Sequence, residues 1–279
     1  MGERSLTLIQ SILLGIIQGL TEFLPISSSA HLVIMPYLLG WEIPPQEAFI
    51  FDVLVQLGTL LAVILFFWKD LKLIILGVIK GLFRKQPFSE QSSRLGWMLV
   101  LATLPAILVG LLFKDYVEWV FKSPVATGLL LFGTAALLVI AEVIGKRTRD
   151  IENLSWLDSL VIGLFQVISL LPGISRSGAT ISGGMVRNLE RPSAARFSFL
   201  MSVPVMIGAG TLAIIDLLQL PDFSVQLPTL IAGFISAAIV GYLTIRWLLA
   251  YLVNRRLFPF AIYCVVLSSL ILVIWMIRS

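Results

Sequence analysis

Polar residues that could do chemistry interrupt an apolar stretch near the start of the chain. The segment Gly19 to Ile34 reads GLTEFLPISSSAHLVI and places a carboxylate, Glu22, and the chain's only histidine, His31, on either side of a proline and three serines. A carboxylate inside an apolar tract is costly to bury in a membrane, and it commonly marks a functional site. A histidine near a carboxylate and serines is a candidate general acid or base. The segment therefore predicts a buried site for acid–base chemistry.

The spacing of these residues predicts two helices with a break between them. Gln18 and Glu22 are four residues apart, so they share one face of a helix that Pro25 brings to an end. A second helix is expected to start near Ala30, and the serines at 27–29 are candidates for its N-cap. Capping alone would explain the serines, because serine commonly caps helices, but it leaves the carboxylate unexplained.

A second polar break lies in the other half of the chain, where residues 170–185 read LLPGISRSGATISGGM. Pro172 and Gly173 are expected to end one helix, and the residues at 175–177, SRS, to precede another. Arg176 in an apolar tract costs at least about 2.5 kcal/mol on insertion scales, so an anion should compensate it. A structural ion pair with Glu22 would do so. A guanidinium also matches phosphate oxygens with two parallel hydrogen bonds, which favours a phosphate ligand.

Both breaks present the N-terminus of a short helix, which offers free N–H donors and the positive end of the helix dipole. Two such ends converging on one arginine predict a site for a phosphorylated ligand. The residues expected to contact its phosphate, besides Arg176, are Ser27, Ser29, Ser175, Ser177 and Thr180.

The composition predicts the elements that hold this site. The chain is 58% apolar and 13% charged, with a mean hydropathy of +0.99. About 20 apolar residues in helical form cross a hydrocarbon layer of about 30 Å. The segments that meet this length are 49–68, 95–113, 125–144, 197–217, 227–250 and 258–277. We therefore expect an all-α, polytopic integral membrane protein with six full transmembrane helices in a single membrane domain, 1–279.

Composition also excludes other classes. The pI of 9.4 could suggest nucleic acid, but the positive charges are segregated by loop as membrane topology demands, so no nucleic-acid partner is expected. Cys264 is the only cysteine, which rules out an intramolecular disulfide. One cysteine with one histidine cannot form a zinc cage.

The two breaks belong to an internal repeat. A shift of 148 residues lays SILLGIIQGLTEFLPISSSA (11–30) over SLVIGLFQVISLLPGISRSG (159–178) without a gap, and the matches include serine, glycine and glutamine. We interpret the chain as two repeats, about 1–145 and 150–279. Each repeat holds three full spans after its break, so the second starts on the opposite side and the topology is inverted. Irregular backbone at membrane depth must be covered by protein or a watery cavity, so each break is expected to be a re-entrant hairpin, and the two to meet.

The distribution of lysine and arginine predicts the orientation. Most of them fall in the segments 69–94, 145–158, 187–196 and 251–257, which the positive-inside rule places in the cytoplasm. Both termini are then expected outside. The segment 70–88 is too polar for a clear span, and we expect an amphipathic helix on the cytoplasmic surface.

The motifs QGLTEFLPISSSAH and LPGISRSGATISGGM resemble the two signatures of the undecaprenyl-diphosphate phosphatase family, also called the bacitracin-resistance phosphatases. The similarity covers nearly the whole chain and includes FDVLVQLGTLLAV (51–63) and RFSFLMSVP (196–204). The family removes the terminal phosphate of a lipid diphosphate at the outer face of the bacterial membrane, which recycles the carrier for peptidoglycan synthesis. The resemblance implies this activity, together with bacitracin resistance.

The resemblance also implies roles for individual residues. Gln18 and Glu22 occupy the family's acidic pair, Ser28 and His31 match its serine and histidine, and Arg176 belongs to its PGxSRSxxT motif. Gln18 is a departure, because some members have glutamate there and a glutamine cannot be a charged metal ligand or a base. These residues establish no cofactor with certainty. The one candidate is a divalent cation, Mg²⁺ or Ca²⁺, that arrives with the diphosphate and is held by Glu22 with Gln18.

The expected reaction is hydrolysis of undecaprenyl diphosphate to undecaprenyl phosphate and inorganic phosphate. Ser28 is the expected nucleophile, activated by His31 or by Glu22, and direct activation of water by His31 is an open alternative. Arg176 and the helix N-termini stabilise the transferring phosphoryl group. A transporter or flippase of a phosphorylated lipid is the alternative class, because inverted repeats with broken helices are typical of secondary transporters. The one protein partner considered is a second copy of the chain.

Overall fold

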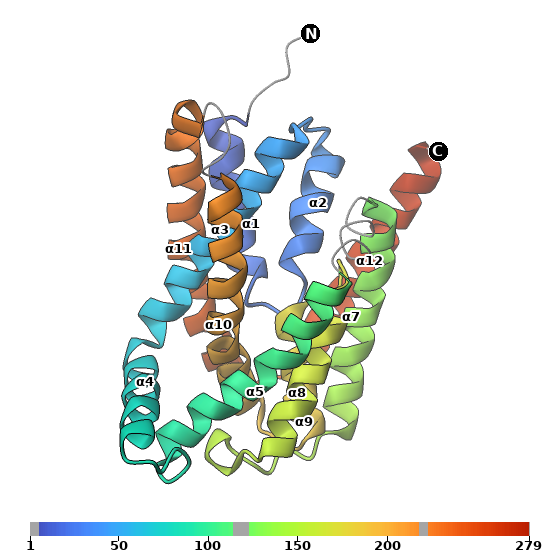
Figure 1. Ribbon diagram of the computed structural model, residues 1–279. Helices are drawn as coiled ribbons and strands as arrows, with labels where there is room; N and C mark the ends of the chain where they lie inside the picture. The colour runs from blue at the N-terminus through green and yellow to red at the C-terminus, as the bar shows by residue number, and fades with distance from the viewer. Residues whose placement is uncertain (1–5, 114–122, 218–222, 279) are drawn as a thin grey trace.

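The computed structural model describes residues 6–113, 123–217 and 223–278 of the 279-residue chain. Within these ranges the chain is helical, and the one strand-like feature is an isolated bridge between Arg149 and Leu189. The expected all-α class is therefore confirmed (Figure 1). The elements are α1 (Leu8–Thr21), α2 (Ser28–Leu39), α3 (Pro45–Phe66), α4 (Trp68–Phe83), α5 (Gln91–Leu112), α7 (Pro124–Ile144), η1 (Ile151–Asn153), α8 (Trp156–Ile168), α9 (Arg176–Val186), α10 (Arg191–Leu217), α11 (Phe223–Asn254) and α12 (Phe258–Arg278).

Five helices in the described part of the chain are long and apolar enough to cross a membrane. Their candidate spans are Glu47–Phe66, Gln91–Leu112, Val125–Ile144, Leu227–Asn254 and Phe258–Ile277. They coincide with five of the six expected segments, so the chain is a multi-pass membrane protein. The remaining segment, 197–217, is helical within α10 but is not among these five. The first half of α10 is packed inside the protein, since Phe197 and Leu200 are completely buried.

Each polar break separates two short helices, as expected. α1 and α8 both begin with a capping box: Thr7 with Gln10 in α1, and Ser155 with Asp158 in α8. α1 ends at Thr21 and α8 at Ile168, ahead of the two prolines, and α2 and α9 follow after short turns. The helix predicted over 70–88 is α4, which is shorter and begins two residues earlier.

The first helix of each hairpin packs against a long helix from the other half of the chain. α1 lies on α11, and α8 lies on α5. Glycines allow this close approach, because a Cβ built at Gly163 would lie 2.5 Å from the carbonyl oxygen of Ala102. At Gly15, 148 residues earlier, it would collide with the carbonyl oxygen of Gly233. Small residues at helix crossings of this kind are typical of membrane bundles.

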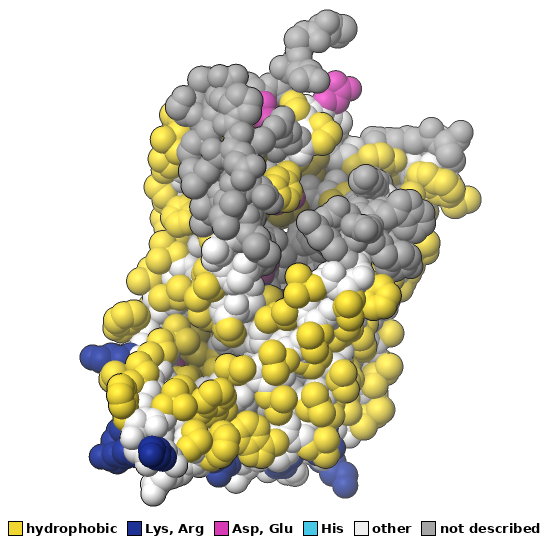
Figure 2. All heavy atoms as spheres, viewed as in Figure 1, with side chains coloured by type: hydrophobic (Ala, Val, Ile, Leu, Met, Phe, Trp, Pro, Cys, Tyr) yellow, Lys and Arg dark blue, Asp and Glu magenta, His cyan; other side chains and the backbone are white. Residues whose placement is uncertain are grey.

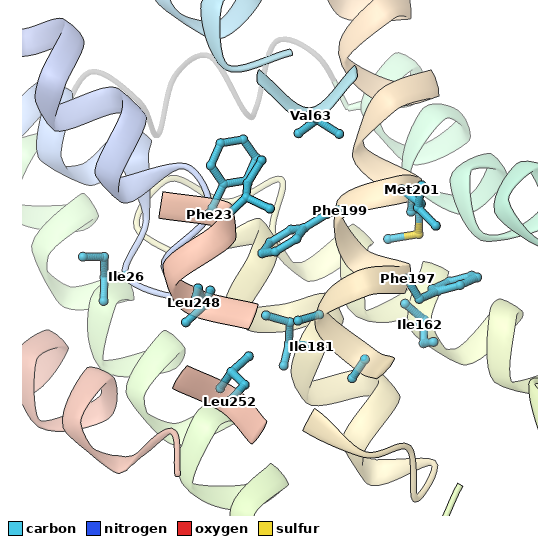
Figure 3. Packing of buried hydrophobic residues seen from close by; sticks show 14 of the residues in the cluster. Phe23, Ile26, Val63, Ile162, Ile181, Phe197, Phe199, Met201, Leu248 and Leu252 are labelled. Atoms are coloured by element: carbon cyan, nitrogen blue, oxygen red, sulfur yellow. The ribbon is translucent and has the colours of Figure 1, made fainter. Parts of the chain in front are cut away.

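The hydrophobic core lies around the two breaks (Figure 3). Phe23, in the turn after α1, is completely buried, and its ring meets Phe199 of α10 edge to face, with centroids 5.4 Å apart and an interplanar angle of 83°. Ile181 of α9 is buried in the same cluster. Burying a phenylalanine ring contributes roughly 3–5 kcal/mol against truncation to alanine, so this contact fixes the turn in place.

Lysine and arginine side chains gather at one end of the molecule, near the turn between α4 and α5, and hydrophobic side chains cover the middle (Figure 2). The first turn of α1 and the last turns of α12 lie at the opposite end (Figure 1). The two described ends of the chain are therefore on the same side of the molecule.

A buried carboxylate anchors the start of α8 at the basic end. Asp158 accepts hydrogen bonds from Arg149 at 2.8 Å and from Arg187 at 2.7 Å. Burial alone would raise the pKa of this carboxyl, but hydrogen bonds from Arg149, Ser155 and Arg187 outweigh it and hold the pKa at about 2. Asp158 is therefore charged at neutral pH, and it ties the start of the second hairpin to its end.

Candidate active site

The Glu22 carboxylate joins the two polar breaks. Glu22 is the C-cap of α1, and its oxygen Oε2 accepts from the Gln18 amide at 2.9 Å and from the Ser28 hydroxyl at 2.5 Å. The other oxygen, Oε1, accepts from Nη2 of Arg176 at 2.7 Å. The side chains of Glu22 and Arg176 are 9% and 20% exposed, so the ion pair is largely buried but still accessible from outside the protein. The structure thus brings together four of the residues singled out in the sequence.

Ser28 is aimed at this carboxylate by an unusual turn. Ser27 is the N-cap of α2 and has φ 70° and ψ 99°, a conformation that residues with a side chain rarely adopt. Such backbone costs of order 1–3 kcal/mol and persists only where surrounding contacts enforce it. Because Ser27 caps the helix, α2 begins at Ser28, two residues before the predicted start at Ala30. Ser28 therefore lies in the first turn and not in the preceding loop.

The two ring nitrogens of His31 have partners other than the carboxylate. Its Nδ1 lies 2.7 Å from the carbonyl oxygen of Ser27, and its Nε2 lies 2.7 Å from the hydroxyl oxygen of Tyr263 in α12. A carbonyl oxygen can only accept, so Nδ1 carries the proton and Nε2 accepts from the phenol. No hydrogen bond joins His31 to Ser28 or Glu22. Of the two bases that the sequence left open, Glu22 is the one in contact with the Ser28 hydroxyl.

The second hairpin is shaped by its own set of caps. Ser175 is the N-cap of α9, and its hydroxyl accepts from the Gly178 N–H at 3.1 Å. Arg176 and Ser177 therefore lie inside the helix, which begins two residues earlier than the sequence predicted. Thr134 of α7 holds the turn from outside, because its hydroxyl accepts from Ser175 N–H and donates to the Gly173 carbonyl, both at 2.9 Å.

Hydroxyl groups of α9 link the hairpins to one another and to α10. Ser177 donates to the Leu24 carbonyl in the first break at 3.0 Å, and its hydroxyl lies 3.1 Å from that of Ser175. The Thr180 hydroxyl lies 2.6 Å from that of Ser198 and donates to the Arg176 carbonyl at 2.8 Å. These hydroxyls already have protein partners, so direct contact of Ser175, Ser177 or Thr180 with a phosphate stays a prediction.

The two helix N-termini retain donors for an anion. The caps use the N–H groups of Ala30 and Gly178. The N–H groups that precede them in the first turns have no partner in the described part of the chain, and they belong to Ser28, Ser29, Arg176 and Ser177. Both helices, of 12 and 11 residues, direct their positive ends to the place where Arg176 meets Glu22. The arrangement can hold a phosphate.

A bound cation would find few ligands here. The described residues contain no group of three or more His, Cys, Asp or Glu side chains that could hold a metal. Oε1 of Gln18 is buried without a hydrogen-bond partner, and it lies on the side chain whose amide contacts Glu22. One carboxylate and one amide oxygen fit a hard cation only if most of its ligands come from the diphosphate and water.

Comparison with known proteins places both hairpins within one family. The family described as bacitracin resistance protein BacA matches residues 11–270. The chain belongs to this family.

Relatives match over nearly their full lengths. A protein from Chlorobium phaeovibrioides is 42% identical over 96% of this chain and 97% of its own length. One from Chlorobaculum tepidum is 43% identical over 94% and 95%, and one from Moorella thermoacetica is 41% identical over 98% and 100%. Each of these relatives is named undecaprenyl-diphosphatase.

Three residues of the cluster were not found from the sequence. They are Tyr263, Thr134 and Ser198, which contact His31, the second turn and Thr180. Tyr263 is 232 residues from its partner, and Thr134 is 41 residues from Ser175. Tyr263 and Thr134 lie inside long apolar helices, so no local signal marks them. Ser198 lies two residues after Arg196 in the segment RFSFLMSVP, but nothing in that segment indicates that it pairs with Thr180.

Proposed function

We propose that the protein is an undecaprenyl-diphosphatase, which hydrolyses undecaprenyl diphosphate to undecaprenyl phosphate and inorganic phosphate. This activity recycles the lipid carrier of cell-wall synthesis and supports resistance to bacitracin. Membership of the family and the names of its relatives support the substrate. The observation that carries the chemistry is that the Ser28 hydroxyl and the Arg176 guanidinium meet on the two oxygens of Glu22.

In this proposal Ser28 is the nucleophile and Glu22 is its base. The Ser28 proton passes to Oε2 of Glu22 as the serine oxygen bonds to the terminal phosphorus. The anhydride bond breaks, and undecaprenyl phosphate leaves with the bridging oxygen. Water then attacks the phosphoserine, and protonated Glu22 returns its proton to Ser28 as phosphate departs. In the alternative route, water attacks the diphosphate directly. Glu22 would again be the base, and no phosphoserine would form.

Arg176 supplies positive charge to the transferring group. In the resting protein it is paired with Glu22, and an incoming phosphate can take over the guanidinium, which leaves the carboxylate free to accept a proton. The N-termini of α2 and α9 add N–H donors to the same phosphate. Stabilising the developing charge is the main task in phosphoryl transfer, and one well-placed donor contributes about 10²–10³ in rate.

A divalent cation, Mg²⁺ or Ca²⁺, fits this site as a companion of the diphosphate. Glu22 and Oε1 of Gln18 are the residues that would hold it. When bound, it would neutralise charge on the phosphate oxygens.

We also propose the finer membrane architecture: six full spans, two re-entrant hairpins and two inverted repeats. Packing of α1 on α11 and of α8 on α5 supports an exchange of partners between the halves. The described chain ends share one end of the molecule, and the basic side chains gather at the other. By the positive-inside rule the basic end is cytoplasmic, so both termini are outside. The site then opens to the outer side of the bacterial cell membrane.

Phosphate release by the purified protein in detergent tests the activity. With undecaprenyl diphosphate, Ser28→Ala and Arg176→Ala are each expected to lower turnover by about 10² or more. Ser236→Ala is the matched control, because that hydroxyl donates to the Ala232 carbonyl within α11, away from the cluster. Normal turnover in either site variant would remove that residue from the proposed mechanism. Lipid translocation in vesicles without phosphate release would favour the flippase.

A further inference from the structure

Tyr263 and His31 form a chain of hydrogen bonds that ends on the backbone beside Ser28. The phenol O–H of Tyr263 donates to Nε2 of His31, and the Nδ1–H of His31 donates to the Ser27 carbonyl, each at 2.7 Å. Ser27 is the residue with φ 70°, and the next residue along the chain is Ser28. The chain therefore runs from the membrane helix α12 to the strained turn that aims the proposed nucleophile.

The two rings are nearly parallel, and they are offset far enough for the phenol oxygen to reach Nε2 at hydrogen-bond distance. Their planes differ by 8°, and their centroids are 5.6 Å apart. Stacked rings would be separated by about 3.5 Å, yet the nitrogen and the phenol oxygen are only 2.7 Å apart. The contact between the two rings is therefore a hydrogen bond and not face-to-face stacking. With both ring nitrogens engaged, His31 has no free position for a proton from Ser28.

We propose that His31 is a positioning residue for Ser28 and that Tyr263 is the residue that orients His31. The imidazole ring supports the turn: its Nδ1–H binds the Ser27 carbonyl and keeps the Ser27 backbone in its rare conformation. The Ser28 hydroxyl thereby stays on Glu22. A base role for His31 is not part of this arrangement. The expected effect on turnover rests on the proposed phosphatase activity, whereas the ring contacts can be measured without it.

Two substitutions of His31 distinguish a positioning role from a role as general base. The amide N–H of asparagine occupies nearly the place of Nδ1–H, whereas that of glutamine occupies nearly the place of Nε2. If His31 has a positioning role, His31→Asn keeps turnover within about tenfold of the wild type. His31→Gln and His31→Ala lower turnover by about 10²-fold or more, because displacing a reacting group by about 1 Å can cost that much in rate. Equal loss in His31→Asn and His31→Gln, with both variants folded, would overturn the proposal.

Nuclear magnetic resonance of the ring gives a readout that needs no turnover. The chain has one histidine, so protein labelled with ¹⁵N-histidine and purified without a histidine tag gives one pair of ring signals. We expect a neutral ring with its proton on Nδ1, and a shift of the Nε2 signal in Tyr263→Phe together with a lower kcat and little change in KM. The control is Tyr251→Phe, whose hydroxyl donates to the Arg256 carbonyl. A proton on Nε2, or the same ring signals in Tyr263→Phe as in the wild type, would refute the role of Tyr263. If the wild-type protein releases no phosphate but shows the expected ring signals, the proposed phosphatase activity is refuted and the hydrogen-bond chain from Tyr263 through His31 to Ser27 still stands.

Discussion

Glu22 has two carboxylate oxygens, and the structure assigns them different partners. One faces the hydroxyl of Ser28, and the other faces the guanidinium of Arg176. A shielded ion pair contributes little net stability, because both charges lose their water, but leaving one partner alone in the interior costs about 3–5 kcal/mol. Residue changes here therefore alter stability and activity together, and the two effects need to be separated.

A pair of neutral substitutions separates them. Glu22→Gln alone should lower the melting temperature, because it leaves Arg176 without its carboxylate. Adding Arg176→Gln should recover part of that loss, while phosphate release stays at least about 10²-fold below wild type in both variants. The measurements are thermal unfolding in detergent and phosphate release. Glu47→Gln is the control, since that carboxylate accepts from the Leu6 N–H away from the cluster. Substantial activity in the double variant would contradict the assignment of Glu22 as the base.

The sequence was sufficient for the charged and capping residues but not for their partners. Glu22, Arg176 and the serines stand out because polar groups in apolar tracts are costly. The direction in which His31 points depends on Tyr263, which comes from the far end of the chain and has an ordinary apolar context. The start of α2 was misplaced by two residues, because the backbone of Ser27 adopts a conformation that serine rarely takes.

At the scale of elements, the short helices of the hairpins are held by backbone contact with long neighbours. Prolines and serines made the positions of the breaks predictable, and hydropathy identified five of the spans. The role of α10 was less predictable, because the segment 197–217 was expected to be a full span, whereas Phe197 and Leu200 at its start are buried in the protein. Hydropathy reports the absence of charge and does not distinguish lipid from protein surroundings.

The crossing of α8 and α5 gives a prediction at this scale. Gly163→Ala would place a Cβ 2.5 Å from the Ala102 carbonyl, and backbone cannot yield as a side chain does. We expect a loss of stability of about 1–3 kcal/mol, measured as a lower midpoint of thermal unfolding. Gly110→Ala in α5 is the matched control, because its Cβ would meet only the Leu170 side chain, at 3.8 Å. Equal midpoints for the two variants would show that the helices do not cross this closely.

At the scale of the whole molecule, the basic end and the hairpins predict an orientation. In a Cys264→Ala background, Glu42→Cys lies between α2 and α3, and Ser89→Cys lies between α4 and α5, and both positions are exposed. A membrane-impermeant thiol reagent should label position 42 in intact cells and position 89 only after lysis, because positive loops stay in the cytoplasm. Labelling in the reverse order would invert the proposed orientation and turn the site toward the cytoplasm.

The ion pair between Glu22 and Arg176 joins residues that are 154 positions apart. The proposed nucleophile, Ser28, and its proposed base, Glu22, come from the segment before Gly145, and the guanidinium proposed to bind the phosphate comes from the segment after Asp150. Neither piece alone carries a complete set of reactive groups. If the gene were divided between the codons for Gly145 and Asp150, each polypeptide alone should be inactive. Hydrolysis of the lipid diphosphate when both are co-expressed would show that the two halves assemble in the bilayer.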